Sequence, residues 1–173
     1  CIRDRVTYCG YVGPDEPIPD RSYARADLSL GEAKLIVITG GGGVDAYPMM
    51  QRSIRALAGL GDQTYRAIAL AGPLMDEADR AALRSLTRGT RVEVWDQAVN
   101  PLMLFSAADL VVTMGGYNSL TEAVMAGARV LVMPRIRHAP SGEATVRSSR
   151  GVDEMPPDRE QLVRAQAFAT RGL

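Results

Sequence analysis

The sequence contains few cysteines, one histidine and no excess of either charge. Its 173 residues include two cysteines, both near the start of the chain. A disulfide framework or a zinc site made of cysteine and histidine is therefore not expected. Twenty basic and twenty acidic side chains balance, which gives no electrostatic case for binding nucleic acid or an anionic membrane. Two thiols without a disulfide framework fit a reducing compartment, so we expect a cytoplasmic protein.

Long apolar runs and a signal-peptide pattern are also missing. No run approaches the roughly 20 residues that span a bilayer, so no transmembrane segment is expected. Hydrophobic residues nevertheless make up 46% of the chain, which is enough to build a core and excludes general disorder. The chain begins with Cys1 and stops directly after a helical pattern. We therefore expect a piece of a longer protein, with segments lost at both ends.

Strand-like and helix-like patterns alternate through the middle of the chain. Continuous apolar runs predict strands at residues 34–39, 65–71, 91–95, 110–114 and 129–133. Helical spacing of apolar residues predicts helices at 46–58, 76–86, 101–107, 118–126 and 158–170. Parallel neighbours need crossover connections, so the predicted fold class is a doubly wound, Rossmann-like α/β sheet in a single domain. Ligands bind such sheets at the carboxyl ends of the strands.

Three segments fall outside this alternation. Residues 6–12 predict a short strand, and residues 14–31, rich in Pro, Asp and Ser, predict a loop or linker. We therefore divide the chain into an interdomain strand and linker (1–31) and a ligand-binding domain (32–173). Residues 135–157 lack periodicity and predict an insertion loop within that domain. The loop carries four arginines and the single histidine, and it is either a plain insertion or a flap over a bound anion.

A run of four glycines, residues 40–43, separates the first predicted strand from its helix. Glycine lets the backbone approach a ligand closely, and free amides at a helix start attract anions. Gly41 and Gly42 are therefore candidate binding residues, although a tight turn without a ligand is the alternative. The run lacks the Lys-Ser or Lys-Thr of a Walker loop and the acidic partner of a dinucleotide-binding fingerprint.

A second glycine cluster, Gly115 and Gly116, ends the fourth predicted strand and leads into a helix. The amides of its first turn, with the side chains of Asn118 and Ser119, suit a diphosphate. Glu122 lies one turn further on, where a carboxylate can accept hydrogen bonds from two vicinal hydroxyls. The alternative is structural, because Ser119-x-x-Glu122 also matches a capping box, in which the glutamate only reaches back to the cap amide.

The glycine clusters and the segments after them form a series of motifs along the chain. The glycine run is followed by Ala-Ala-Asp-Leu-Val-Val at 107–112, by Gly-Gly-Tyr-Asn-Ser-x-x-Glu at 115–122, and by Ala-Gly-Ala-x-Val-Leu-Val-x-Pro at 126–134. This order resembles the C-terminal, donor-binding half of GT-B fold glycosyltransferases. The family 28 type and predicted bacterial glycosyltransferases with a Met-Gly-Gly-Tyr-Asn signature are the nearest in appearance. The resemblance implies a two-lobed enzyme whose N-terminal lobe is absent from this chain.

The resemblance also implies a role for each candidate residue toward a nucleotide sugar, by default a UDP-sugar. Glu122 would hold the ribose hydroxyls, and Gln161 would reach the sugar ring. Trp95, at the end of the third predicted strand, would lie near the base. The remaining candidates would surround the diphosphate and sugar: Gly41, Gly42, Gly115, Gly116, Asn118 and Ser119. The structural alternatives are a packing role for Trp95 and, for Gln161, a capping box with Asp158.

The chemistry of glycosyl transfer adds two expectations. No Asp-x-Asp pair stands at a strand end, so we expect a donor site without metal or other cofactor, in which helix and glycine amides stabilise the departing diphosphate. The chain offers no good general base, so the base and the acceptor site are expected in the missing lobe, and the chain alone should be inactive.

The function predicted from the sequence is thus the donor-binding part of a hexosyltransferase. Its expected partners are the nucleotide sugar and its own N-terminal lobe, with peripheral membrane contact of the full enzyme if the acceptor is hydrophobic. Two alternatives stay open. One is an epimerase or hydrolase of nucleotide sugars on the same fold, which needs acid and base carboxylates in the cleft. The other is a non-catalytic nucleotide-sugar-binding module.

Overall fold

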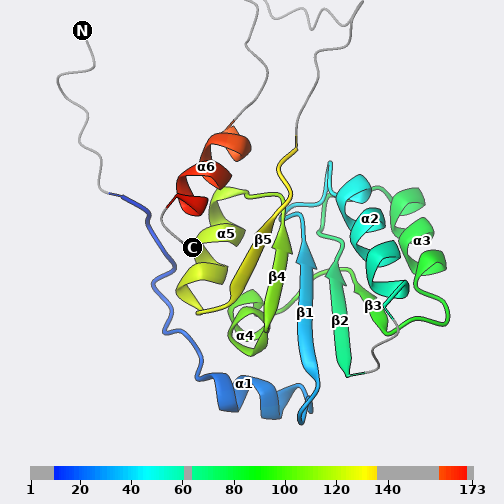
Figure 1. Ribbon diagram of the computed structural model, residues 1–173, viewed down its shortest axis with the longest axis horizontal. Helices are drawn as coiled ribbons and strands as arrows, with labels where there is room; N and C mark the ends of the chain where they lie inside the picture. Colours follow the sequence, from blue (N-terminus) through cyan, green and yellow to red (C-terminus); the bar gives the residue numbers. More distant parts are fainter. Residues whose placement is uncertain (1–9, 61–63, 136–159, 171–173) are drawn as a thin grey trace, which may run out of the picture.

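A five-stranded, wholly parallel sheet forms the centre of the computed structural model, which describes residues 10–60, 64–135 and 160–170. Its strands, in the order β3-β2-β1-β4-β5, are shown in Figure 1. Their bounds are β1 Lys34–Thr39, β2 Tyr65–Leu70, β3 Val92–Trp95, β4 Leu110–Thr113 and β5 Arg129–Val132. The order changes direction between β1 and β4, so the topological switch point lies between these two strands.

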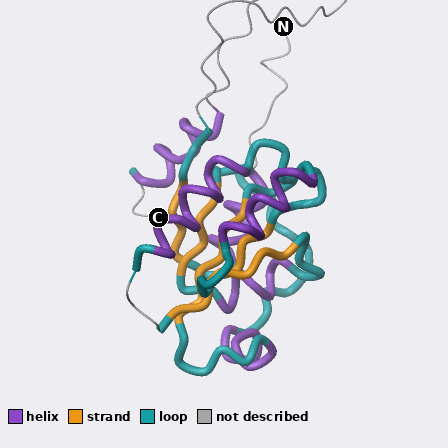
Figure 2. Tube along the Cα trace, turned by 90° about the vertical axis from the view of Figure 1, so that its right-hand side faces the viewer, coloured by secondary structure: helices purple, strands orange, loops and turns teal. Residues whose placement is uncertain are grey.

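Helices cover both faces of the sheet (Figures 1 and 2). Two helices pack on one face, α2 (Tyr47–Ala58) and α3 (Glu77–Leu86). Three pack on the other, α1 (Arg21–Asp27), α4 (Pro101–Ala107) and α5 (Tyr117–Met125). The last helix, α6 (Glu160–Ala169), lies beside α5 and β5. This two-sided arrangement confirms the predicted doubly wound α/β fold.

The core consists of two apolar layers, one on each side of the sheet. Successive residues of β1 enter opposite layers: Val37 packs with α1, α4 and α5, and Ile38 packs with α2 and α3. Both side chains are fully buried, as are Val111 of β4 and Ile68 of β2. Burial on both faces explains why these strands are continuous apolar runs in the sequence.

The observed elements agree with the predicted ones to within about two residues, with two differences. The predicted linker contains helix α1, and residues 10–12 of the predicted first strand are not in a strand. Residues 6–9, most of the insertion loop (136–157) and the first two residues of the last predicted helix (158–159) lie outside the described residues. The linker prediction was wrong at α1 because Asp20 caps this helix, accepting hydrogen bonds from the amides of Ser22 and Tyr23.

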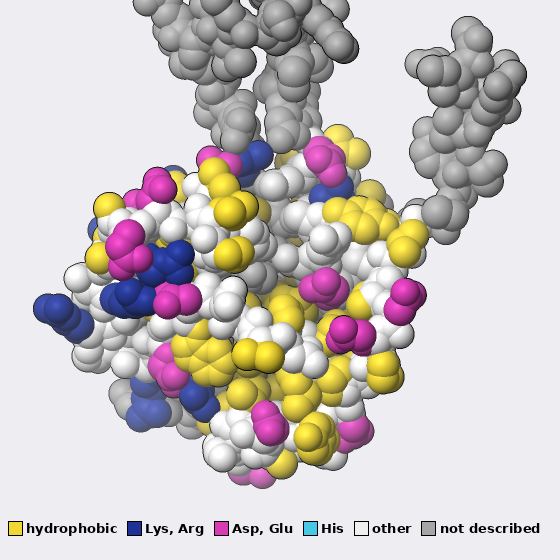
Figure 3. All heavy atoms as spheres, turned by 180° about the vertical axis from the view of Figure 1, so that it is seen from behind, with side chains coloured by type: hydrophobic (Ala, Val, Ile, Leu, Met, Phe, Trp, Pro, Cys, Tyr) yellow, Lys and Arg dark blue, Asp and Glu magenta, His cyan; other side chains and the backbone are white. Residues whose placement is uncertain are grey.

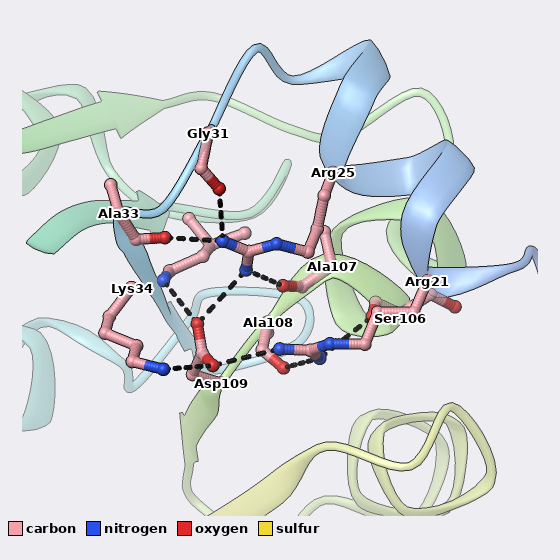
Figure 4. A network of polar contacts seen from close by, with 10 residues as sticks. Arg21, Arg25, Gly31, Ala33, Lys34, Ser106, Ala107, Ala108 and Asp109 are labelled. Carbon is pink, nitrogen blue, oxygen red and sulfur yellow. Dashed lines mark hydrogen bonds and ion pairs between the residues drawn. The ribbon is translucent and has the colours of Figure 1, made fainter.

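A polar network at the amino end of the sheet also holds α1 in place (Figure 4). Arg21 and Arg25 of α1 pair with Asp109 at 2.9 and 3.2 Å, and Lys34 lies 3.6 Å away. The amide of Leu35 donates to the same carboxylate at 2.9 Å. Burial opposes ionisation of Asp109, but this amide and the three cations outweigh it and lower its pKa. The network joins α1, β1 and the start of β4.

The surface is mixed in character. Figure 3 shows basic side chains mainly on the left of the face seen from behind, with hydrophobic side chains gathered in its lower middle and right. Within the described ranges, no helix is both long enough and apolar enough to cross a bilayer.

Candidate functional site

The two glycine clusters lie side by side at the switch point. Thr39 and Thr113, the last residues of β1 and β4, are register partners and both are buried. Each threonine hydroxyl accepts a hydrogen bond from the amide two residues later, Gly41 at 3.2 Å and Gly115 at 3.4 Å. Both glycines have positive φ angles, +68° and +82°. The two loops therefore leave neighbouring strands through the same kind of turn.

The run of four glycines serves packing and leaves one open position. A Cβ on the candidate Gly42 would lie 3.3 Å from Leu74 Cδ1, so its role toward a ligand stays a prediction. A Cβ atom on Gly40 would lie 2.2 Å from the Ala46 Cβ, and one on Gly43 would lie 2.3 Å from the carbonyl oxygen of Ala71. These two positions must be glycine for the fold. A Cβ on Gly41 would instead lie 3.5 Å from the Ser119 hydroxyl oxygen, so this candidate faces the second loop across the switch point.

Helix α5 begins at this point without a capping side chain. Its N-cap is Gly116, and the first helical hydrogen bond runs from the Leu120 amide to the Gly116 carbonyl at 3.0 Å. Within the described part of the chain, the amides of Tyr117, Asn118 and Ser119 have no acceptor. The capping-box interpretation is therefore wrong, since Ser119 lies inside the helix. Among the residues that the structure describes, no side chain caps this positive end of α5, which lies beside Gly41.

Gly116 is not required by the fold around it. Its φ of −58° and ψ of 146° suit any residue, and a Cβ placed there would meet no described atom within 4 Å. Without a side chain, Gly116 leaves room for a close approach to the amides at the start of the helix. Close approach to the helix amides is what a bound anion needs.

Glu122 lies on α5 one turn beyond Ser119, on the same side of the helix. It is partly buried, and no hydrogen bond or ion pair joins its carboxylate to any other described residue. Burial raises the pKa of its carboxyl group. A partly desolvated carboxylate without a partner has both oxygens available for hydroxyl groups of a ligand.

The other two predicted binding residues have partners within the protein. The Gln161 side-chain oxygen accepts the Arg135 amide at 2.9 Å, which ties the start of α6 to the end of β5. The Trp95 indole donates to Glu93 at 3.1 Å. Trp95 stands on β3, three strand spacings (about 14 Å) from β4. Gln161 lies beside the second glycine loop, since a Cβ built on Gly115 would lie 3.6 Å from the Gln161 backbone oxygen, whereas Trp95 is remote from that loop. The roles of both residues toward sugar and base stay predictions.

Sequence reasoning missed Arg164 of α6. Its side chain is 10% exposed, and Nη1 donates to the carbonyl oxygen of Gly115 at 2.5 Å. Its guanidinium carbon lies 5.7 Å from the centre of the Tyr117 ring, and it pairs with Glu160. The Glu160–Arg164 spacing of four residues is typical of an exposed helix pair, so no local pattern indicates that Arg164 turns inward.

The paired threonines were also missed, although their signal is visible. Both strands end in Thr-x-Gly, at Thr39 and again at Thr113. Metal ligands are not gathered in the described residues, which contain no group of three His, Cys, Asp or Glu side chains placed to hold an ion. No general base is assigned, and metal independence stays a prediction.

The chain is similar in structure to parts of two solved glycosyltransferases. One is the glycotransferase of kitacinnamycin, with 21% identity over 78% of this chain and a TM-score of 0.49. The other is SnogD from Streptomyces nogalater, with 22% identity over 75% of this chain and a TM-score of 0.43. The matched parts are 32% and 31% of those proteins, so the chain spans about a third of their length. No family model and no curated protein matches the chain, so the resemblance to family 28 stays a prediction.

Proposed function

We propose that this chain is the donor-binding part of a glycosyltransferase that uses a nucleoside diphosphate sugar. The proposal depends chiefly on the uncapped start of α5, which faces the Gly41 loop across the switch point. Three amides without acceptors within the described residues, together with the helix dipole, suit a diphosphate. Gly116 leaves the space for that diphosphate to approach, and Asn118 and Ser119 add side-chain donors at its edge.

Glu122 extends this site toward the nucleoside. A ribose offers two adjacent hydroxyl donors, and a carboxylate can accept both. A hydrogen bond to a charged group contributes about 1.5–3 kcal/mol, which offsets the cost of keeping Glu122 ionised in a partly buried position. The proposed site therefore has groups suited to both the diphosphate and the ribose of the nucleotide.

The proposed chemistry follows from where charge develops. As the sugar is transferred, the bond from its anomeric carbon to the diphosphate breaks and negative charge grows on the departing oxygen. Amides already aimed at that oxygen stabilise the transition state more than the ground state. The acceptor and its general base come from another part of the full protein, in keeping with a chain that spans about a third of the two glycosyltransferases.

Isothermal titration of the 173-residue chain with UDP and UDP-sugars, with and without EDTA, tests the proposal. We expect one site per chain, with the same affinity in both buffers. No detectable binding at millimolar UDP, GDP or TDP overturns the proposal. Loss of binding in EDTA overturns its metal-independent part, and sugar transfer by the chain alone overturns the assignment of acceptor and base elsewhere.

Substituting Glu122 tests the ribose contact separately. Glu122→Ala should weaken UDP by about 2 kcal/mol, or roughly thirtyfold, because a charge-assisted hydrogen bond is lost. The matched ligand is 2′-deoxy-UDP, whose affinity for the variant and for the wild type should differ less. An equal loss for both ligands argues against the ribose contact.

A further inference from the structure

Arg164 contacts the Gly115–Gly116 peptide at the start of the candidate site. Its Nη1 atom holds the carbonyl oxygen of Gly115 at 2.5 Å. In a trans peptide the carbonyl and the next N–H point in opposite directions. Fixing the Gly115 oxygen toward α6 therefore aims the Gly116 N–H away from α6, and this N–H has no acceptor among the described residues.

The surroundings of Arg164 hold the guanidinium at this place. The side chain is nine-tenths buried, and its charged end lies 5.7 Å from the centre of the Tyr117 ring. Tyr117 is stacked on Tyr11 at 5.3 Å, and its hydroxyl accepts the Val12 amide at 2.6 Å. Glu160, the paired carboxylate, is 67% exposed and therefore solvent-screened, so it neutralises the buried cation only in part.

We propose that Arg164 is a positioning residue of the diphosphate site, which orients the Gly115–Gly116 peptide and adds a positive charge behind the start of α5. This inference rests on the proposed function and goes beyond it, because it assigns phosphate selectivity to a residue of α6. The charge acts on the phosphates through the glycine loop. It has little effect on a neutral nucleoside held further along the site.

The test compares UDP with uridine, followed by NMR titration of the same chain. Arg164→Met should lower UDP affinity about tenfold or more, and uridine affinity by less than about twofold, because the effect is electrostatic. Arg164→Lys, which keeps a charge but not the planar donor pair, should retain more UDP affinity than Arg164→Met. Raising the salt concentration should reduce the difference in UDP affinity between the wild type and Arg164→Met, because salt screens the charge of Arg164.

Arg25→Met provides the matched control. Arg25 is another largely buried arginine that holds backbone carbonyls and an acidic side chain, but it lies at the amino end of the sheet. Its loss should lower the melting temperature without changing the ratio of UDP to uridine affinity.

The results separate this inference from the proposed function. If the wild type does not bind UDP, the proposed function fails. If the wild type binds UDP but Arg164→Met weakens UDP and uridine equally, only the role of Arg164 fails, and its effect is structural. Equal UDP affinity of Arg164→Lys and Arg164→Met also overturns the charge contribution. If Arg164→Met does not fold, Arg164→Lys is compared with the wild type instead: a loss of UDP affinity with uridine affinity unchanged supports the inference, and equal or absent losses for the two ligands overturn it.

Discussion

The two ends of the β1–β4 strand pair treat polar groups in opposite ways. At the amino end, Asp109 has four donors or cations around it, and Arg25 is bound by three carbonyl oxygens as well (Figure 4). At the carboxyl end, the first amides of α5 and the Glu122 carboxylate lack partners among the described residues. Satisfied polar groups stabilise a fold, whereas unsatisfied ones cost stability and are retained where a ligand completes them. Stability should therefore depend on the amino end, and binding on the carboxyl end.

The largest effect that tests this contrast is expected at Asp109. Asp109→Ala leaves three cations and the Leu35 amide without their shared acceptor, and should lower the free energy of unfolding by about 3 kcal/mol. UDP affinity should not change. Urea unfolding measures the first quantity and calorimetry the second. Asp15→Ala, in an exposed stretch without described partners, is the control and should stay within about 0.5 kcal/mol. An equal fall in the free energy of unfolding for Asp109→Ala and Asp15→Ala would contradict a stabilising role of the Asp109 network.

Two glycine substitutions at the carboxyl end distinguish a residue needed for stability from a residue needed for binding. In Gly43→Ala the new Cβ would lie 2.3 Å from the Ala71 carbonyl oxygen, and the backbone φ of +99° is strained for alanine. We therefore expect the free energy of unfolding to fall by about 2 kcal/mol. Gly116→Ala meets open space at a φ of −58°, so its stability should be unchanged or slightly higher. UDP affinity should nevertheless fall about tenfold for Gly116→Ala, by crowding the diphosphate. Unchanged UDP affinity argues that nothing approaches Gly116.

The regular part of the fold could be predicted from sequence because each signal was local. Strands buried on both faces are continuous apolar runs, and Gly127, with a φ of +75°, follows the last turn of α5, where glycine is common. Helix α1 could not be predicted in the same way. Its seven residues are stabilised by Asp20 and by contacts with Asp109, 88 residues from Arg21, which no local pattern reveals.

The candidate site was predictable to a similar extent. The glycine loops were found because glycine marks unusual backbone, and sheet topology then brings the ends of β1 and β4 together. The cap of α5 was not predictable, since Asn118, Ser119 and Gly116 all suit that position and the choice depends on where β4 stops. Arg164 was missed because its contact with Gly115 joins residues 49 positions apart.

The smallest expected effect is the pH dependence of Glu122, and it tests whether the open carboxylate costs stability. Because burial raises its pKa, the folded chain keeps this proton at pH values where the unfolded chain has released it. The resulting stability is present below the ordinary pKa of glutamate and is lost as the pH rises through the raised value. Glu122→Gln, which cannot ionise, should therefore match the wild type in acid and melt slightly higher at neutral pH.

With UDP bound, the wild type should instead melt higher than Glu122→Gln at neutral pH. A ribose bound to Glu122 favours the ionised carboxylate, so the UDP affinity of the wild type should rise between acid and neutral pH more than that of Glu122→Gln. Melting curves with and without UDP across this range measure both trends, and comparison with the variant removes the titration of the phosphate itself. If Glu122→Gln melts higher than the wild type at neutral pH both with and without UDP, the carboxylate is not where the nucleoside binds. A reversal shows that the instability of the empty carboxyl end is relieved by the ligand, which is the property that distinguishes it from the amino end.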